Sequence, residues 1–91
     1  MIRLGLGWEA VHAVNPRLIY AGVFGCGQDG AYAALPAYDD LIQGVSGLAA
    51  LFHRSTGEAP RYVPNAIADR VTGLSAVGVM LAAVIERQSS G

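Results

Sequence analysis

The spacing of apolar residues in the first quarter of the chain predicts a short helix followed by a strand. Residues 8–14 are expected to form the helix, which should end at Asn15, because Pro16 disfavours helical backbone at the residue before it. Residues 17–24, "RLIYAGVF", are rich in β-forming residues and apolar on both alternating faces. That pattern is typical of a buried parallel strand.

Two later segments repeat their apolar residues at helical spacing. The first covers residues 37–52, where the apolar stripe falls at positions 38, 41, 42, 45, 48 and 52. The second covers residues 66–86, and its apolar face consists of Ile67, Val71, Leu74, Gly78, Leu81 and Ile85. We therefore expect two apolar helices joined by a polar loop, which holds at most a short strand around Tyr62.

These elements predict the α/β fold class: a short helix, one core parallel strand and two apolar helices. A single strand cannot satisfy its own backbone donors and acceptors, because each of them needs a neighbour in a sheet. The chain is therefore expected to be an excerpt of a larger fold. The remaining strands would come from absent sequence or from another chain.

The composition supports an excerpt, because it is unusually apolar for so short a chain. The 91 residues are 53% hydrophobic and only 14% charged, whereas a small solitary domain needs a generous polar surface. The most apolar run, residues 71–85, is shorter than the roughly 18 residues that a membrane span requires, and it suits a buried core helix. A small membrane-associated or helix-pairing protein built on residues 71–85 is the alternative.

Charge and cysteine content exclude several classes of function. A formal net charge of −1 with scattered arginines provides no basic stripe for nucleic acid. The single cysteine, Cys26, cannot form an internal disulfide and fits a reducing cytoplasm. His12 and His53 have no partner at ligand spacing, so we expect no metal site.

A glycine motif follows the predicted strand. Residues 25–30, "GCGQDG", match the Gly-x-Gly-x-x-Gly pattern of a dinucleotide-binding turn. In such a turn the helix begins within the motif and faces the pyrophosphate. Here the helical pattern starts only after Pro36, and Asp39 and Asp40 come too early to bind a ribose. We therefore expect no NAD, and interpret the glycines as a tight turn.

Asp69 is the most informative acidic residue. It stands at or near the start of the last helix, and is the only acid between Glu58 and Glu86. One interpretation is a carboxylate that caps this helix or balances its dipole. The other is a carboxylate held ionised beside an apolar wall, which is a candidate covalent nucleophile. The pair Asp39 and Asp40 is expected to cap the preceding helix.

Several segments together resemble the class III CoA-transferases, the CaiB/BaiF family. The resemblance covers nearly all of the chain. It rests on four motifs: "NPRLIY" at 15–20, Gly-x-Gly-Gln at 25–28, "YDD" at 38–40 followed by Gln43 and "SG" at 46–47, and Asp-x-x-x-Gly at 69–73. It implies that residues 1–91 are a partial CoA-transferase family III domain whose N- and C-terminal parts are missing, and that the isolated chain is inactive.

The resemblance also implies a reaction and its residues. Family members move coenzyme A from an acyl-CoA thioester to a carboxylic acid, and Asp69 matches their nucleophile, which forms a mixed anhydride and then an aspartyl-CoA thioester. Arg3 matches an arginine that contacts CoA phosphates, while Pro36, Ala37 and Tyr38 match a segment that borders the CoA and acyl groups. Some members carry a lysine in place of Pro36, so substrate preference is expected to differ. The implied setting is an interlocked, cytoplasmic homodimer without membrane, metal or NAD.

Overall fold

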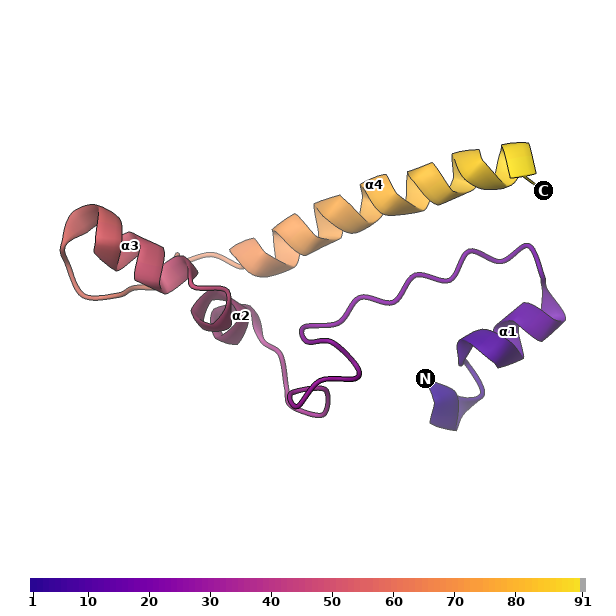
Figure 1. The fold of residues 1–91 in the computed structure, drawn as a ribbon, viewed down its shortest axis with the longest axis horizontal. Helices are drawn as coiled ribbons and strands as arrows, with labels where there is room; N and C mark the ends of the chain where they lie inside the picture. The colour runs from indigo at the N-terminus through magenta and orange to yellow at the C-terminus, as the bar shows by residue number, and fades with distance from the viewer. Residues whose placement is uncertain (91) are drawn as a thin grey trace. The chain divides into compact units, whose positions relative to one another are not determined.

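The computed structural model describes residues 1–90, and every regular element in that range is helical. In chain order these elements are the 3₁₀ turn η1 (Ile2–Leu4) and the α-helices α1 (Trp8–Val14), α2 (Asp39–Val45), α3 (Leu48–Thr56) and α4 (Ile67–Ser90) (Figure 1). They belong to two compact units. One holds Met1–Gly22 and the C-terminal residues from Ala76 onward, and the other holds Val23–Ser75.

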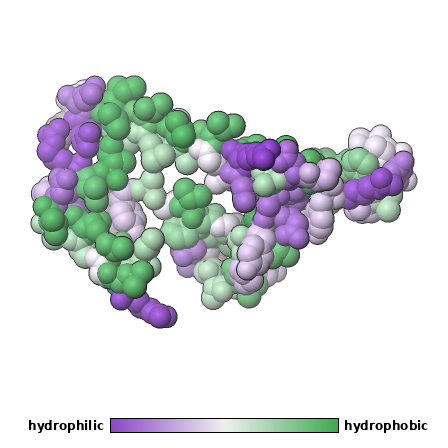
Figure 2. All heavy atoms as spheres, turned by 180° about the vertical axis from the view of Figure 1, so that it is seen from behind, coloured by the Kyte–Doolittle hydropathy of each residue, from purple (hydrophilic) through white to green (hydrophobic). Residues whose placement is uncertain are grey.

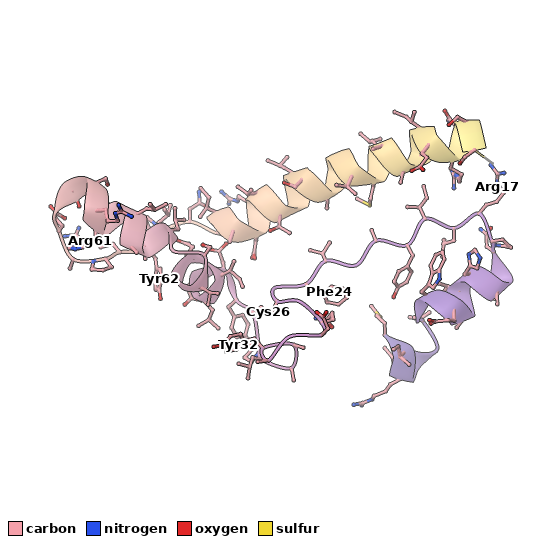
Figure 3. All side chains as sticks on the ribbon, viewed as in Figure 1. Arg17, Phe24, Cys26, Tyr32, Arg61 and Tyr62 are labelled. Atoms are coloured by element: carbon pink, nitrogen blue, oxygen red, sulfur yellow. The ribbon has the colours of Figure 1, made fainter. Side chains whose placement is uncertain are left out.

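The predicted α/β class is wrong for the described residues. Residues 17–24 are not helical, yet no strand is assigned to them or to any other part of 1–90, including the loop around Tyr62. A strand exists through backbone hydrogen bonds to a neighbouring strand, and apolar alternation alone does not supply that neighbour. The carbonyl of Arg17 instead accepts a hydrogen bond from the Arg87 guanidinium at 2.8 Å. Arg17 is labelled in Figure 3.

The first helix is confirmed, with the predicted bounds. α1 covers Trp8–Val14, and Asn15 follows it in an extended conformation. The Trp8 ring stacks on His12 with 4.4 Å between ring centroids, and packs edge-on against Tyr20 at 6.1 Å. The Tyr20 hydroxyl donates a hydrogen bond to the carbonyl of Leu6 at 2.9 Å. Aromatic packing thus ties the helix to the extended segment within the first unit.

The single helix predicted for residues 37–52 is two helices, α2 and α3. The chain breaks at Gly47, whose φ of 83° lies in the left-handed region that a side chain disfavours. A second left-handed glycine, Gly57 with φ of 75°, ends α3. The periodic pattern was therefore right about helical structure and wrong about continuity. The break allows α3 to pack back against α2.

The last predicted helix is confirmed and extends further than expected. α4 covers Ile67–Ser90, whereas the apolar pattern predicted an end near residue 86. By length and composition alone α4 could cross a membrane, a property that core helices of soluble proteins share. Most of its large apolar side chains are exposed, with 76% of Leu74 and 69% of Val79 accessible.

The described residues bury no hydrophobic side chain. The one buried side chain among them is polar: Gln43 is 2% exposed. Apolar atoms are correspondingly widespread on the face drawn in Figure 2. Since burial of apolar surface is the main stabilising contribution to folding, these faces are suited to packing against further protein.

Candidate functional site

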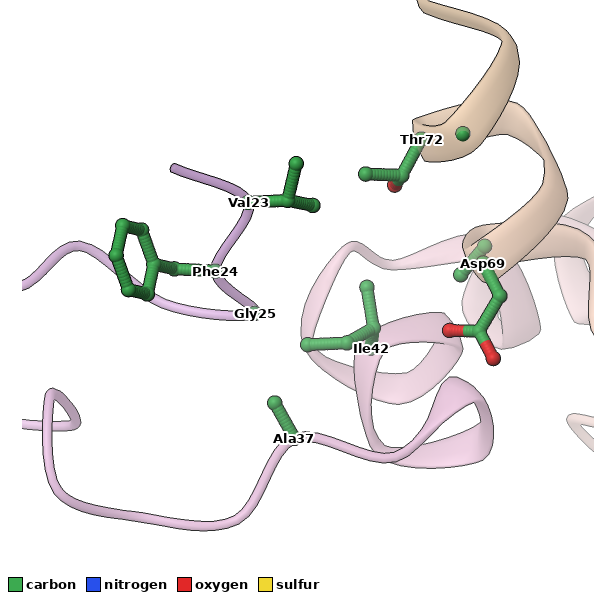
Figure 4. Close-up of a pocket in the computed structure, with 9 residues that line it drawn as sticks. Val23, Phe24, Gly25, Ala37, Ile42, Asp69 and Thr72 are labelled. Carbon is green, nitrogen blue, oxygen red and sulfur yellow. The ribbon is translucent and has the colours of Figure 1, made fainter. Parts of the chain in front are cut away.

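Asp69 lies on the wall of a pocket within the second unit. The pocket has a volume of about 390 Å³ and is lined by Val23, Phe24, Gly25, Ala37, Ile42, Ala68, Asp69, Thr72 and Gly73 (Figure 4). Asp69 is the only charged residue of this lining, and most of the other side chains are apolar. The arrangement places one carboxylate against an apolar cavity.

The start of α4 is capped by a residue from another helix. The first amides of a helix lack intrahelical partners, and Ala66, which precedes α4, has no side-chain acceptor to offer. Asp39, at the start of α2, supplies one: its Oδ1 accepts a hydrogen bond from the backbone amide of Asp69 at 2.9 Å. Asp39 therefore fixes the backbone of Asp69 from outside the helix.

This cap bears on the two interpretations of Asp69. Within residues 1–90 no hydrogen bond reaches the Asp69 carboxylate, and the residue is exposed. The capping task belongs to Asp39, whose two oxygens accept hydrogen bonds from the Asp69 amide and from Gln43. The Asp69 carboxylate is consequently available to a ligand in the pocket. The predicted cap of α2 by Asp39 and Asp40 is wrong, because both residues lie in the first turn of α2, and the N-cap residue before them makes no side-chain cap hydrogen bond.

Gln43 holds the cap and the loop before α4 together. Its Nε2 donates to Asp39 Oδ2 at 2.6 Å and lies 3.2 Å from the carbonyl oxygens of both Val63 and Asn65. Its Oε1 accepts the backbone amide of Val63 at 2.7 Å. Both ends of this buried side-chain amide are therefore in use, as a buried polar group requires.

The hydrogen bonds of Asp39 change its acidity. The backbone amide of Asp69 is the largest cause, followed by the side chain of Gln43, and together they hold the pKa of Asp39 below its usual value; partial desolvation opposes them. The amide of Ala68 and the charge of Arg70 act in the same lowering direction. Donors that favour the ionised form of a carboxylate stabilise the folded state in which they exist.

This pKa shift predicts an acid-side loss of stability. Because the folded-state pKa is the lower one, the contribution of Asp39 is fully present above its unfolded pKa of about 3.8, and disappears as the pH falls through the folded value. In the whole protein, the thermal midpoint of the wild type should exceed that of Asp39→Asn by a constant amount above about pH 5. The difference should shrink below about pH 4; a difference that persists unchanged to pH 3 would contradict this account.

The structure brings only some of the predicted binding residues to this pocket. Ala37 lines it, and its neighbours Pro36 and Tyr38 are exposed beside it in sequence, Tyr38 by 68%. Arg3 belongs to the other unit, where it is exposed within η1. The connecting role of Asp39 and Gln43 was not predicted. The Tyr-Asp…Gln motif contained both residues, but sequence spacing gave no indication that they contact the start of α4.

The glycine turn ends in a loop, as the position of Pro36 predicted. The first helix after the turn, α2, begins at Asp39 rather than within the motif. Gly25 lies very close to Ala37, which precedes α2: a Cβ placed on Gly25 would overlap the Cβ of Ala37. In the part of the chain that the structure describes, no three His, Cys, Asp or Glu side chains lie together as metal ligands would.

Comparison with known proteins places the chain in a family. The model of CoA-transferase family III matches residues 1–91. The chain therefore belongs to CoA-transferase family III, in agreement with the resemblance found in its motifs. No solved structure matches the chain.

Three relatives of the chain are CoA-transferases by name. The chain is 36% identical over 91 residues to the succinate–glutarate CoA-transferase of Agrobacterium fabrum. This match covers 100% of the chain and 22% of the relative. It is 34% identical over 91 residues to the acetyl-CoA:oxalate CoA-transferase of Acetobacter aceti, and that match covers 100% of the chain and 23% of the relative. The human succinyl-CoA:glutarate CoA-transferase is 34% identical to the chain over 89 residues, and that match covers 97% of the chain and 20% of the relative. The chain thus spans about a fifth of the length of these relatives.

Proposed function

We propose that the whole protein transfers coenzyme A between an acyl-CoA thioester and a carboxylic acid, with Asp69 as the nucleophile. The observation that carries this proposal is the Asp69 carboxylate itself, which lines an apolar pocket while another residue caps its helix. Family membership supports the reaction class, and the relatives named above are all CoA-transferases.

The reaction proceeds by exchange of partners at Asp69. A carboxylate oxygen of Asp69 attacks the thioester carbonyl, so that a C–O bond forms, the C–S bond breaks and CoA leaves as thiolate. The thiolate then attacks the Asp69 carbonyl of the mixed anhydride, giving an aspartyl-CoA thioester and the free donor acid. The acceptor carboxylate attacks this thioester, releasing the thiolate again. Attack of the thiolate on the acceptor acyl carbon yields the new acyl-CoA and restores Asp69.

The surroundings of Asp69 suit this chemistry. Covalent catalysis replaces one difficult displacement by several easier ones, and each step here exchanges activated acyl groups of similar transfer potential. Most of the side chains that line the pocket are apolar, and once the whole protein covers the site such walls would help to keep water from the anhydride. Asp69 stands in the first turn of α4, as its third residue.

The remaining contacts to acyl-CoA are assigned on the family resemblance. Ala37 lines the pocket, and with Pro36 and Tyr38 it would border the acyl and pantetheine groups. Arg3 would pair with a CoA phosphate, since a guanidinium binds phosphate through charge-assisted hydrogen bonds. The scheme uses neither a metal nor NAD. The exposed apolar faces support an interlocked homodimer, and the single cysteine supports a cytoplasmic setting.

A second candidate function rests on α4. Its length and hydropathy are compatible with a membrane span, so a membrane-associated or helix-pairing protein is the alternative. Flotation of the whole protein with phospholipid vesicles separates the two candidates, because a CoA-transferase whose α4 is a core helix stays in the soluble fraction.

The proposed reaction is tested by exchange kinetics on the whole protein. With succinyl-CoA and a radiolabelled dicarboxylic acid such as glutarate, label should enter the CoA thioester pool, and initial-rate plots should show a substituted-enzyme pattern. Acids of different chain length then define the acceptor. Failure of all acyl-CoA and carboxylate pairs to exchange label would contradict the proposal.

A further inference from the structure

We infer that Gln43 is a positioning residue for the transfer reaction, a buried clamp that sets the orientation of Asp69. The inference deepens the proposed function and rests on it. Gln43 does not line the pocket that contains Asp69, so it touches no reacting group there. It acts through the two segments that determine where α4 begins.

The first of these segments is α2, through Asp39. The Gln43 amide lies 2.6 Å from Asp39 Oδ2, one helical turn earlier, while Asp39 Oδ1 accepts the Asp69 amide at 2.9 Å. One carboxylate thus bridges Gln43 and the backbone of the nucleophile. Without Gln43, the Asp39 side chain would be free to change rotamer and to release the amide of Asp69.

The second segment is the chain leading into α4. Gln43 bonds Val63 at both its amide and its carbonyl, and contacts the carbonyl of Asn65, two residues before the helix starts. Tyr62, the residue before Val63, also packs against α2, because its hydroxyl lies 3.4 Å from the position that a Cβ on Gly44 would occupy. Gln43 therefore restrains the first turn of α4 in two ways: through Asp39, which caps the helix, and through the backbone of residues 63 and 65, which leads into it.

The geometry of Gln43 cannot be reproduced by an apolar residue of similar size. Leucine fills the space but leaves the Val63 amide and the Asp39 carboxylate without their partner, and unpaired buried polar groups are costly. The consequence for catalysis is loss of orientation: a displacement of about 1 Å at a nucleophile costs as much as 10²-fold in rate. Substrate binding depends on other contacts, so kcat should change more than KM.

The experiment compares Gln43→Leu and Gln43→Glu in the whole protein with the matched controls Gln88→Leu and Gln88→Glu. Gln88 is an exposed glutamine in α4, outside the pocket. Each variant is measured for kcat and KM with acyl-CoA, for its thermal midpoint, and for its content of the aspartyl intermediate trapped with hydroxylamine. Gln43→Leu is expected to lower kcat by roughly 10- to 100-fold with KM within about twofold, and the controls should match the wild type.

Gln43→Glu adds a signature that a merely structural role would not produce. An ionised glutamate faces Asp39, the titratable group in contact with position 43, and cannot donate to it. A protonated glutamate resembles glutamine and donates its O–H to Asp39. The ratio of variant to wild-type kcat should therefore rise as the pH is lowered, because like charge and burial raise the pKa of the new glutamate. The same ratio for Gln88→Glu should not vary with pH.

The outcomes separate this inference from the proposed function. If the wild type accumulates the Asp69 intermediate and both Gln43 variants turn over at the wild-type rate, the inference is overturned while the proposed function stands. A pH-independent rate ratio in folded Gln43→Glu overturns it as well, and so does failure of both variants to fold at every pH, which would show a role in folding alone. If the wild type forms no adduct at Asp69, the proposed function has failed instead.

Discussion

Replacement of Asp69 by asparagine in the whole protein is expected to lower kcat for CoA exchange by on the order of 10³-fold or more. An amide of nearly the same size fills the same position, but it cannot form an anhydride by nucleophilic attack. The fold should be retained, because the hydrogen bond that fixes this residue runs from its backbone amide to Asp39 and survives the substitution. The measurement is the initial rate of exchange, with thermal unfolding to verify folding.

A trapping experiment identifies the attacked residue directly. Hydroxylamine added during turnover should convert the activated Asp69 carbonyl into a hydroxamate, which peptide mass spectrometry locates. Asp40→Asn is the matched control: Asp40 is another exposed aspartate in the second unit, it does not line the pocket, and its loss should leave the rate unchanged. Modification at Cys26 rather than at Asp69 would refute the assignment, since Cys26 is the chain's only thiol nucleophile.

The first and last helices, α1 and α4, were predictable from local sequence, whereas the extended segment at residues 17–24 was not. α1 ends where Asn15 and Pro16 dictate, and α4 follows the apolar pattern that begins at Ile67, because capping and periodicity act within a few residues. For residues 17–24 the same kind of pattern indicated a strand, but strand formation depends on a partner that local sequence does not contain. The prediction failed at the step that requires tertiary structure.

The site shows the same division between local and distant contacts. Asp69 was recognisable from its position at a helix start and from the motif at 69–73. The bridge from Gln43 through Asp39 was not, because Asp39 contacts a backbone amide 30 positions further along the chain. The break at Gly47 was missed for a different reason: glycine is compatible with a helix interior, and only the observed φ shows that it left the helix. The residue type at position 69 indicated the chemistry, whereas the contacts that hold Asp69 in place became visible only in the structure.

Gly25→Ala is expected to damage the pocket, although alanine is the smallest possible side chain. The new methyl group would overlap the Cβ of Ala37 on the facing loop, and both residues line the pocket beside Asp69. The two segments must separate, at a cost of roughly 1–3 kcal/mol for overpacking. We expect a lower thermal midpoint and a fall in kcat on the order of 10- to 100-fold, measured in the whole protein.

A reciprocal substitution distinguishes this contact from a general intolerance of the glycine turn. Ala37→Gly removes the methyl group that Gly25→Ala would strike, leaving Ile42 Cδ1 at 3.3 Å as the nearest atom outside residue 37, so the double variant should recover most of the lost stability. Gly27→Ala is the control within the same turn, because its Cβ would meet only the Asp29 side chain at 3.4 Å. If Gly25→Ala is as stable and active as Gly27→Ala, the close approach of the two loops is not what shapes the pocket. If instead only the double variant recovers, the glycine at position 25 is explained by the space that Ala37 occupies.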